Sequence, residues 1–281
     1  MRLRFSFLFS LFLSVHTLFA QDEAYKVYSM VSDLRIRKSP DMKGEVIGKM
    51  ALKDSAQSLG FSEHTATATI RGKEVTDYWV EIETMQGLKG WVFGGAVATW
   101  NVFPNVPKDA KSRAAITVND DGYVIKAKNG VTKTLANTYP LGTMGDENTE
   151  VYHFNAYLPE LKSFSFEKSF YESGSYYLVN EEDGSGVEVK AKPIIAPSSK
   201  QFVCLWNAGG ISVLTLYQLE GRNIKEVWEN ELSTEHSDAF FEKAEWVNEK
   251  EVKLIGNKYS EDGTAIPVIA IFSIATQKIK F

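Results

Sequence analysis

Residues 78–97, Y-W-V-E-I-E-T-M-Q-G-L-K-G-W-V-F-G-G-A-V, decide the fold of this chain. Val80 and Ile82 alternate with polar residues, which predicts a strand with one apolar face. The segment 86–90 contains two glycines and predicts a turn, because glycine adopts positive φ without steric cost. The aromatic and β-branched residues at 91–93 predict a second strand. The stretch therefore predicts a hairpin in a small, strongly bent sheet.

Short strands are also predicted before this hairpin. In Leu34-Arg35-Ile36-Arg37 the apolar residues are expected to point inward and the arginines outward. Pro40 predicts the turn that follows, because it fixes φ and keeps the preceding residue extended. Each predicted strand is bounded by Gly, Pro or Asp. The predicted strands are 25–28, 33–37, 45–50 and 55–61.

The first part of the chain resembles a known family. The motif L-R-I-R-x-x-P at 34–40 and the ending G-W-V at 90–92 together resemble the bacterial SH3 domain, over residues 25–98. The resemblance implies a small five-stranded SH3-like β-barrel, often attached to bacterial cell-wall or cell-surface proteins. Some members bind peptidoglycan peptides. This chain departs from the family between Phe61 and Tyr78, where Arg71-Gly72-Lys73 predicts a longer hairpin. Such a hairpin could cover the groove in which other members of the family bind their ligands.

Five residues of this part are candidates for ligand binding. Trp79 shares a face with glutamates, so we expect it to be partly exposed and to offer a stacking platform for a peptide or glycan; the alternative is that it completes the core. Arg37 could take a carboxylate, or it could anchor its strand as a hydrogen-bond donor. For Trp91, the alternative to ligand binding is a structural role. The candidates expected to border one groove are Arg37, Tyr78, Trp79, Trp91 and Phe93.

The second part, residues 114–281, is also predicted to be β-rich. Pro104 and Pro107 indicate a linker over 99–113. Segments 193–203 and 243–254 each read as strand, polar turn and strand. Their spacing of about fifty residues resembles the blades of a β-propeller, either complete at about four blades or partial. The fold class is thus all-β: a small barrel followed by antiparallel, propeller-like sheets.

Further hairpins and turns support this reading. We expect a hairpin that joins 213–219 to 225–228. The Asp-Gly pairs at 121–122, 183–184 and 262–263 predict tight turns, and their spacing does not match a calcium loop. The aromatic segment 152–177 is interpreted as one buried face of a sheet rather than as a carbohydrate site.

The N-terminus and the composition restrict location and function. Residues 1–20 have two arginines, an apolar run and a small residue before Gln21, which predicts a signal peptide and export to the periplasm or the exterior; an uncleaved anchor is the alternative. No stable transmembrane segment is expected after cleavage. The net charge is −5 without a basic stripe, so a nucleic-acid partner is not expected.

The sequence contains no recognisable catalytic pattern. The single cysteine, Cys204, stands in an apolar strand and is expected to be buried. His64, His153 and His236 lack paired-ligand spacing, so neither a metal nor another cofactor is expected. We therefore expect a non-enzymatic binding protein of the cell envelope, with a peptidoglycan peptide or an envelope protein as partner. The alternative is an envelope-acting enzyme or inhibitor with its site in the second part.

Overall fold

The computed structural model describes residues 25–139, 149–170, 173–208, 210–232, 239–260 and 262–281. The predicted signal peptide at 1–20 lies outside these residues, as do Tyr171, His236 and Glu261. The described chain is all-β, as the sequence predicts, and consists of antiparallel sheets. None of its helices is long and apolar enough to cross a membrane.

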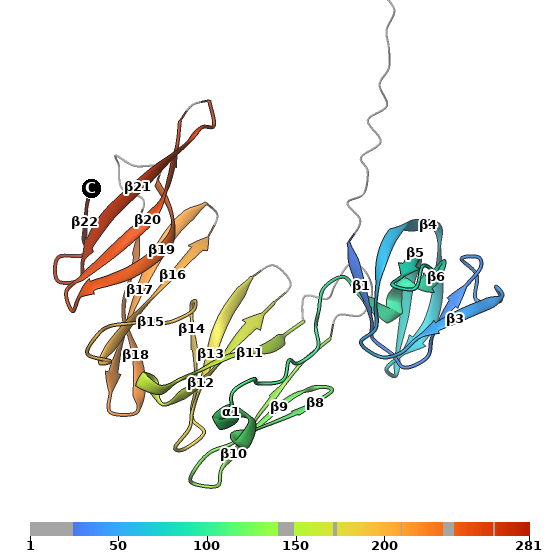
Figure 1. The fold of residues 1–281 in the computed structure, drawn as a ribbon, viewed down its shortest axis with the longest axis horizontal. Coiled ribbons are helices and arrows are strands. Elements are labelled where there is room, and N and C mark those ends of the chain that lie inside the picture. Colours follow the sequence, from blue (N-terminus) through green and yellow to red (C-terminus); the bar gives the residue numbers. More distant parts are fainter. Residues whose placement is uncertain (1–24, 140–148, 171–172, 209, 233–238, 261) are drawn as a thin grey trace, which may run out of the picture.

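The first seven strands form one curled sheet, which is drawn in blue and cyan in Figure 1. Their order in the sheet is β3-β2-β6-β5-β4-β1-β7, and every described pairing is antiparallel. A 3-10 turn, η1 (Gly94–Ala96), precedes the last strand. The strands are β1 (Lys26–Ser29), β2 (Leu34–Arg37), β3 (Val46–Met50), β4 (Ser55–Ile70), β5 (Lys73–Thr84), β6 (Lys89–Phe93) and β7 (Val97–Ala98).

The core of this sheet follows the predicted alternation. Val80 and Ile82 are fully buried, and Leu34 and Ile36 also point inward. Arg35 is exposed, as expected, but Arg37 is buried, so the expectation that both arginines point outward is wrong for Arg37. The buried residues form a cluster that is built entirely from residues of this sheet and its turns. This part of the chain therefore has its own hydrophobic core.

The predicted long hairpin is present. β4 and β5 pair from Ile70↔Lys73 back to Thr65↔Tyr78, beyond the part of β5 that pairs with β6. Its turn has Arg71 at φ 48° and Gly72 at φ 81°. A two-residue turn with both φ values positive matches the right-handed twist of the strands. The hairpin therefore extends from the curled sheet as a two-stranded ribbon.

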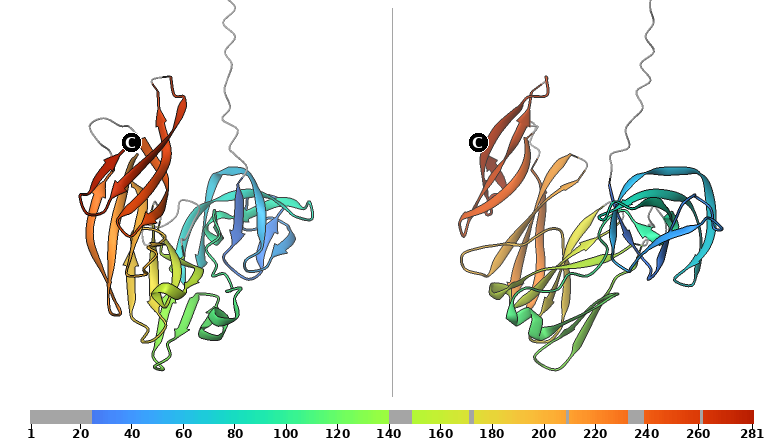
Figure 2. Two further views of the ribbon diagram at one scale, coloured as in Figure 1. Left: turned by 60° about the vertical axis from the view of Figure 1, so that its left-hand side comes forward. Right: turned by 45° about the vertical axis from the view of Figure 1, so that its right-hand side comes forward.

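The rest of the chain forms four small antiparallel sheets, which follow one another along an arc in Figures 1 and 2. Each is a meander of strands in sequence order. The first sheet contains β8 (Ile116–Asn119), β9 (Gly122–Lys126) and β10 (Thr132–Ala136). The second sheet contains β11 (Val151–Leu158), β12 (Ser163–Ser169), β13 (Gly174–Asn180) and β14 (Gly186–Val189). The third sheet contains β15 (Ile194–Ile195), β16 (Gln201–Ala208), β17 (Ile211–Glu220) and β18 (Asn223–Glu231). The fourth sheet contains β19 (Ala239–Asn248), β20 (Glu251–Tyr259), β21 (Ala265–Ser273) and β22 (Lys278–Lys280).

The two repeated segments occupy equivalent places in these sheets. Segment 193–203 contains β15 and the start of β16, and segment 243–254 contains the end of β19 and the start of β20. Both are the first hairpin of a sheet. The hairpin predicted between 213–219 and 225–228 is the β17–β18 pair. Separate apolar clusters lie between successive sheets and stack the four sheets face to face.

The segment between the curled sheet and the first small sheet is packed rather than free. Val102 and Phe103 are buried, so this part of the predicted linker 99–113 contributes residues to a core. The Asn137 side chain donates from Nδ2 to the Val102 carbonyl over 3.0 Å, which holds the segment against the second part. A short helix follows, α1 (Ala110–Ala115), and the Asp109 carboxylate caps it by accepting a hydrogen bond from the Ser112 amide.

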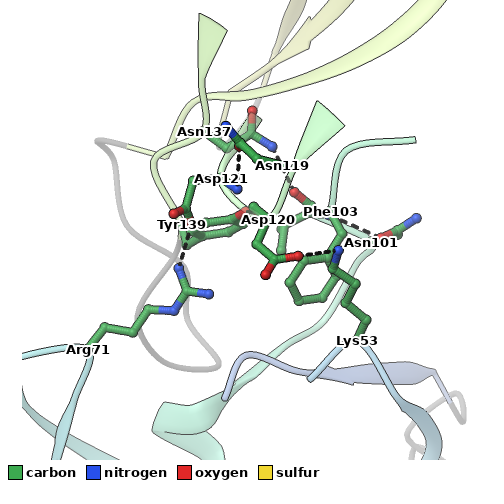
Figure 3. Close-up of polar contacts among 10 residues, drawn as sticks. Lys53, Arg71, Asn101, Phe103, Asn119, Asp120, Asp121, Asn137 and Tyr139 are labelled. Carbon is green, nitrogen blue, oxygen red and sulfur yellow. Dashed lines mark hydrogen bonds and ion pairs between the residues drawn. The ribbon is translucent and has the colours of Figure 1, made fainter. Parts of the chain in front are cut away.

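The curled sheet contacts the β8–β9 turn through two ion pairs, shown in Figure 3. Lys53 Nζ lies 2.7 Å from Asp120 Oδ1, and Arg71 Nη1 lies 3.4 Å from Asp121 Oδ1. An apolar cluster lies beside them and contains residues from both parts: Met30, Ala98, Val102, Phe103, Tyr139 and Val151. The two parts of the chain thus share a junction with a small core of its own.

Candidate functional site

A groove of about 320 Å³ opens on the curled sheet and brings together three of the five candidate residues. Its walls come from three stretches of chain: residues 31–42, which run from the β1–β2 turn through β2 into the β2–β3 turn; the long β4–β5 hairpin; and β6 with η1. The lining residues are Val31, Asp33, Leu34, Arg35, Arg37, Met42, Ala68, Thr69, Ile70, Trp79, Phe93 and Ala96. The candidates among them are Arg37, Trp79 and Phe93.

Two aromatic rings border the inside of the groove. Trp79 and Phe93 pack edge to face with ring centroids 6.0 Å apart, and they are 2% and 5% exposed. The expectation that Trp79 is partly exposed is therefore wrong. Trp79 pairs with Phe93 in an unbroken ladder with β6, and on its other side a bulge in β4 shifts the register between Phe61 and Thr65, opposite Val80 and Tyr78. Successive side chains of a strand point to opposite faces, and Trp79 and Val80 are both buried, so β5 is covered on both faces at this point.

The bulge is held by a hydrogen bond. The Trp79 amide donates to Ser62 Oγ over 3.0 Å, and Ser62 lies within the unpaired part of β4. This bond satisfies a main-chain donor at the point where the ladder is interrupted. Simple alternation along the sequence contains no signal for such an interruption, because the extra residues lie in the partner strand.

Charged side chains surround the apolar part of the groove. Arg37 donates from Nη1 to the Gly44 carbonyl over 2.7 Å, so it anchors the β2–β3 turn to its strand. Arg35 and Asp33 are exposed, and Asp33 pairs with Lys49 at 3.4 Å. The groove therefore offers an apolar floor with both a cation and an anion beside it.

The long hairpin forms one wall of the groove. Ala68, Thr69 and Ile70 belong to β4 just before the turn, and all three line the groove. The hairpin that the sequence predicted thus borders the groove. Met42, which is 46% exposed, lies in the β2–β3 turn on another wall. Sequence reasoning missed Met42 because nothing in a polar turn marks one apolar residue as part of a groove.

The remaining two candidates lie elsewhere. Tyr78 is 44% exposed in β5, but it is not among the residues that line the groove. Trp91 lies in β6 between Glu81 of β5 and Arg37 of β2, and it is partly buried against the core of the curled sheet. The structure thus does not bring Tyr78 and Trp91 to the groove with the other three.

The aromatic segment of the second part is core, as predicted. Tyr152, Phe154, Phe164 and Phe166 are buried between the first and second small sheets. Cys204 is fully buried and lies 3.0 Å from the Ala191 carbonyl. Its expected burial is confirmed, and burial raises the pKa of its thiol to about 12.

A second hollow of about 610 Å³ lies between segment 105–109 and β11. Its lining contains one carboxylate, that of Asp109, and this group already caps α1. His153 is partly buried in β11, and burial lowers its pKa. Among the described residues, no group of three histidines, cysteines or carboxylates could hold a metal ion.

Comparisons with known proteins give distant structural similarities. No family model and no curated protein matches the chain. Among solved structures, the chain is similar to a putative 6-phosphogluconolactonase from Bacteroides fragilis, with 9% identity over 93% of this chain and 94% of that one, and a TM-score of 0.29. It is also similar to TolB from Acinetobacter baumannii, with 11% identity over 91% of this chain and 62% of that one, and a TM-score of 0.27. The all-β architecture is established by the strand pairings of this structure and not by these similarities.

Proposed function

We propose that this chain is a non-enzymatic, exported binding protein of the bacterial cell envelope, and that its curled sheet is an SH3-like barrel whose groove takes a peptide. The observation that carries the proposal is the groove itself. An apolar floor with Trp79 and Phe93 lies beside the exposed Arg35 and Asp33. A peptide in extended form presents apolar side chains together with main-chain and terminal polar groups, which suits such a surface.

The size of the groove supports a short ligand segment. Ligand sites in proteins commonly enclose about 300–1,000 Å³, and this groove has about 320 Å³. It therefore suits one or two side chains of a peptide rather than a whole folded domain. We take a peptidoglycan peptide as the first partner to test, and a segment of an envelope protein as the second.

In this proposal the four small sheets form an open, propeller-like scaffold beside the barrel. The stacking of successive meanders through apolar clusters supports it. A propeller of four blades lies at the lower end of the usual range. The scaffold would hold the barrel and its groove in place next to the envelope partner.

Titration with a synthetic peptidoglycan stem peptide, followed by tryptophan fluorescence, tests the proposal. We expect saturable binding that Met42→Lys and Arg35→Glu weaken at least about tenfold, since both residues line the groove and are exposed; tenfold corresponds to about 1.4 kcal/mol. Met85→Lys is the matched control, because Met85 is 88% exposed and lies outside the groove. Equal binding by all three variants would contradict the groove as the site.

A further inference from the structure

The tip of the long hairpin is bound on two sides. Arg71 Nε donates to the Met30 carbonyl over 3.1 Å, and Nη1 lies 3.4 Å from Asp121 Oδ1 in the β8–β9 turn. The guanidinium also lies over the Tyr139 ring, 4.3 Å from its centroid. Figure 3 shows the Arg71 side chain directed toward Asp121 and Tyr139. One side chain thus joins the hairpin, the start of the barrel and the second part.

The hairpin needs such an anchor. Between Thr65 and Tyr78 its two strands pair only with each other, because β5 pairs with β6 over 79–83 and β4 pairs with β1 over 55–57. An isolated two-stranded hairpin is marginally stable in water. Ile70 belongs to the core of the curled sheet, and Ala66, Ala68 and Val75 pack against it, which holds one face of the ribbon. Its turn, by contrast, is held through the Arg71 side chain.

The same ribbon is a wall of the groove. Ala68, Thr69 and Ile70 line the groove immediately before Arg71 in the chain. Val31, which also lines it, follows Met30, the residue whose carbonyl accepts the Arg71 hydrogen bond. Arg71 therefore joins two groove walls to each other and to Asp121.

We propose that Arg71 is the positioning residue of the groove: it sets the hairpin wall against the β8–β9 turn, so that the second part of the chain supports the ligand site in the barrel. This inference rests on the proposed function for the identity of the ligand, but not for the position of the hairpin. Tyr139 in turn is held by its hydroxyl, which donates to the Asp120 carbonyl. The support under Arg71 is thus fixed by the second part itself.

Three variants of the full chain test this inference. Arg71→Ala removes all three contacts. Arg71→Lys keeps a cation near Tyr139 and Asp121 but loses the planar fork that reaches Met30 and Asp121 together. Lys53→Gln is the matched control, because it removes the other ion pair of the junction, to Asp120 at 2.7 Å, without touching the hairpin. Thermal melts establish that each variant is folded.

Two measurements are made on each variant. Hydrogen–deuterium exchange of residues 65–76 reports the hairpin directly and needs no ligand. We expect about tenfold faster exchange in Arg71→Ala, a smaller rise in Arg71→Lys, and wild-type exchange in Lys53→Gln. Titration with the stem peptide should show affinities that fall in the same order, with about a tenfold loss for Arg71→Ala.

The outcomes separate this inference from the proposed function. Wild-type exchange at 65–76 in Arg71→Ala overturns the inference, as does an equal change in Lys53→Gln. Faster exchange with unchanged peptide affinity also overturns it, because the hairpin would then not matter to the site. If the wild type binds no stem peptide, the proposed ligand is wrong, while faster exchange confined to the Arg71 variants still supports the positioning of the wall.

Discussion

Trp79 and Tyr78 are neighbours in β5 with opposite environments. Trp79 is 2% exposed and contacts Phe93, whereas Tyr78 is 44% exposed. Trp79→Ala should lower the free energy of unfolding by about 3–5 kcal/mol, because it removes a large buried side chain and leaves a cavity. Tyr78→Ala should change it by no more than about 0.5 kcal/mol. Chemical denaturation of the two variants checks this, and a Trp79→Ala protein as stable as Tyr78→Ala would contradict it.

The same residues show where sequence reasoning succeeds and fails at this scale. Alternation correctly placed Val80 and Ile82 inside, because those residues lie in a regular ladder with β6. It failed for Trp79, because the opposite face of β5 is also covered there and the ring packs on Phe93, its partner in β6. It failed for Arg37, whose buried side chain donates a hydrogen bond to the carbonyl of Gly44, seven residues later. Both failures come from contacts that a period of two cannot encode.

At the scale of elements, one carboxylate links α1 to the first and second small sheets. The Glu181 side chain is 6% exposed and lies 2.7 Å from Lys111 Nζ and 3.1 Å from Lys128 Nζ. It also accepts a hydrogen bond from the Tyr157 hydroxyl over 2.9 Å. Burial alone would raise the pKa of Glu181, but hydrogen bonds from Lys111, Tyr157 and Lys128 outweigh it and lower the pKa to about 2.

This lowered pKa predicts a loss of stability in acid. A carboxyl group with a depressed pKa stabilises the fold fully above its usual value of 4.5, and the stabilisation disappears as the pH falls to about 2. Glu181→Gln should therefore be less stable than the wild type by about 1–3 kcal/mol near neutral pH, and the difference should shrink across that acidic window. Melting temperatures measured against pH test this. Glu182→Gln, which removes a neighbouring carboxylate 2.8 Å from Lys128, is the control and should keep the wild-type acid dependence.

Much of the element order could be predicted from the sequence, since local signals determine it. The hairpin turn at Arg71-Gly72, the Asp-Gly turns and the first hairpins of the third and fourth sheets all lie where glycine and polar residues interrupt apolar runs. The burial of segment 102–104 could not be predicted in this way. Prolines mark it as irregular, but irregular backbone can still be packed, here by the Asn137 side chain and the Tyr139 ring. The groove is equally non-local, because its walls come from three separate stretches.

At the scale of the whole molecule, the junction between the curled sheet and the four small sheets combines exposed ion pairs with an apolar cluster. In the pairs Lys53–Asp120 and Arg71–Asp121, the side chains are between 30% and 70% exposed. Exposed pairs of this kind contribute about 0–1 kcal/mol each and are screened by salt. Phe103, by contrast, is 4% exposed and packs on Tyr139 with centroids 5.9 Å apart. The apolar cluster should therefore dominate the free energy of the junction, while Arg71 serves to position the hairpin.

This division of roles predicts how the junction responds to salt and to mutation. At about 1 M salt, where the Debye length is about 3 Å, the radius of gyration from small-angle X-ray scattering should stay at its low-salt value. Phe103→Ala removes a buried ring from the cluster and should cost about 3–5 kcal/mol at the junction, so the same measurement should show a larger radius of gyration. Lys53→Gln leaves the cluster intact and should scatter as the wild type does. A molecule that expands in salt but not with Phe103→Ala would instead be held together by its charges, because only the ion pairs are weakened by salt.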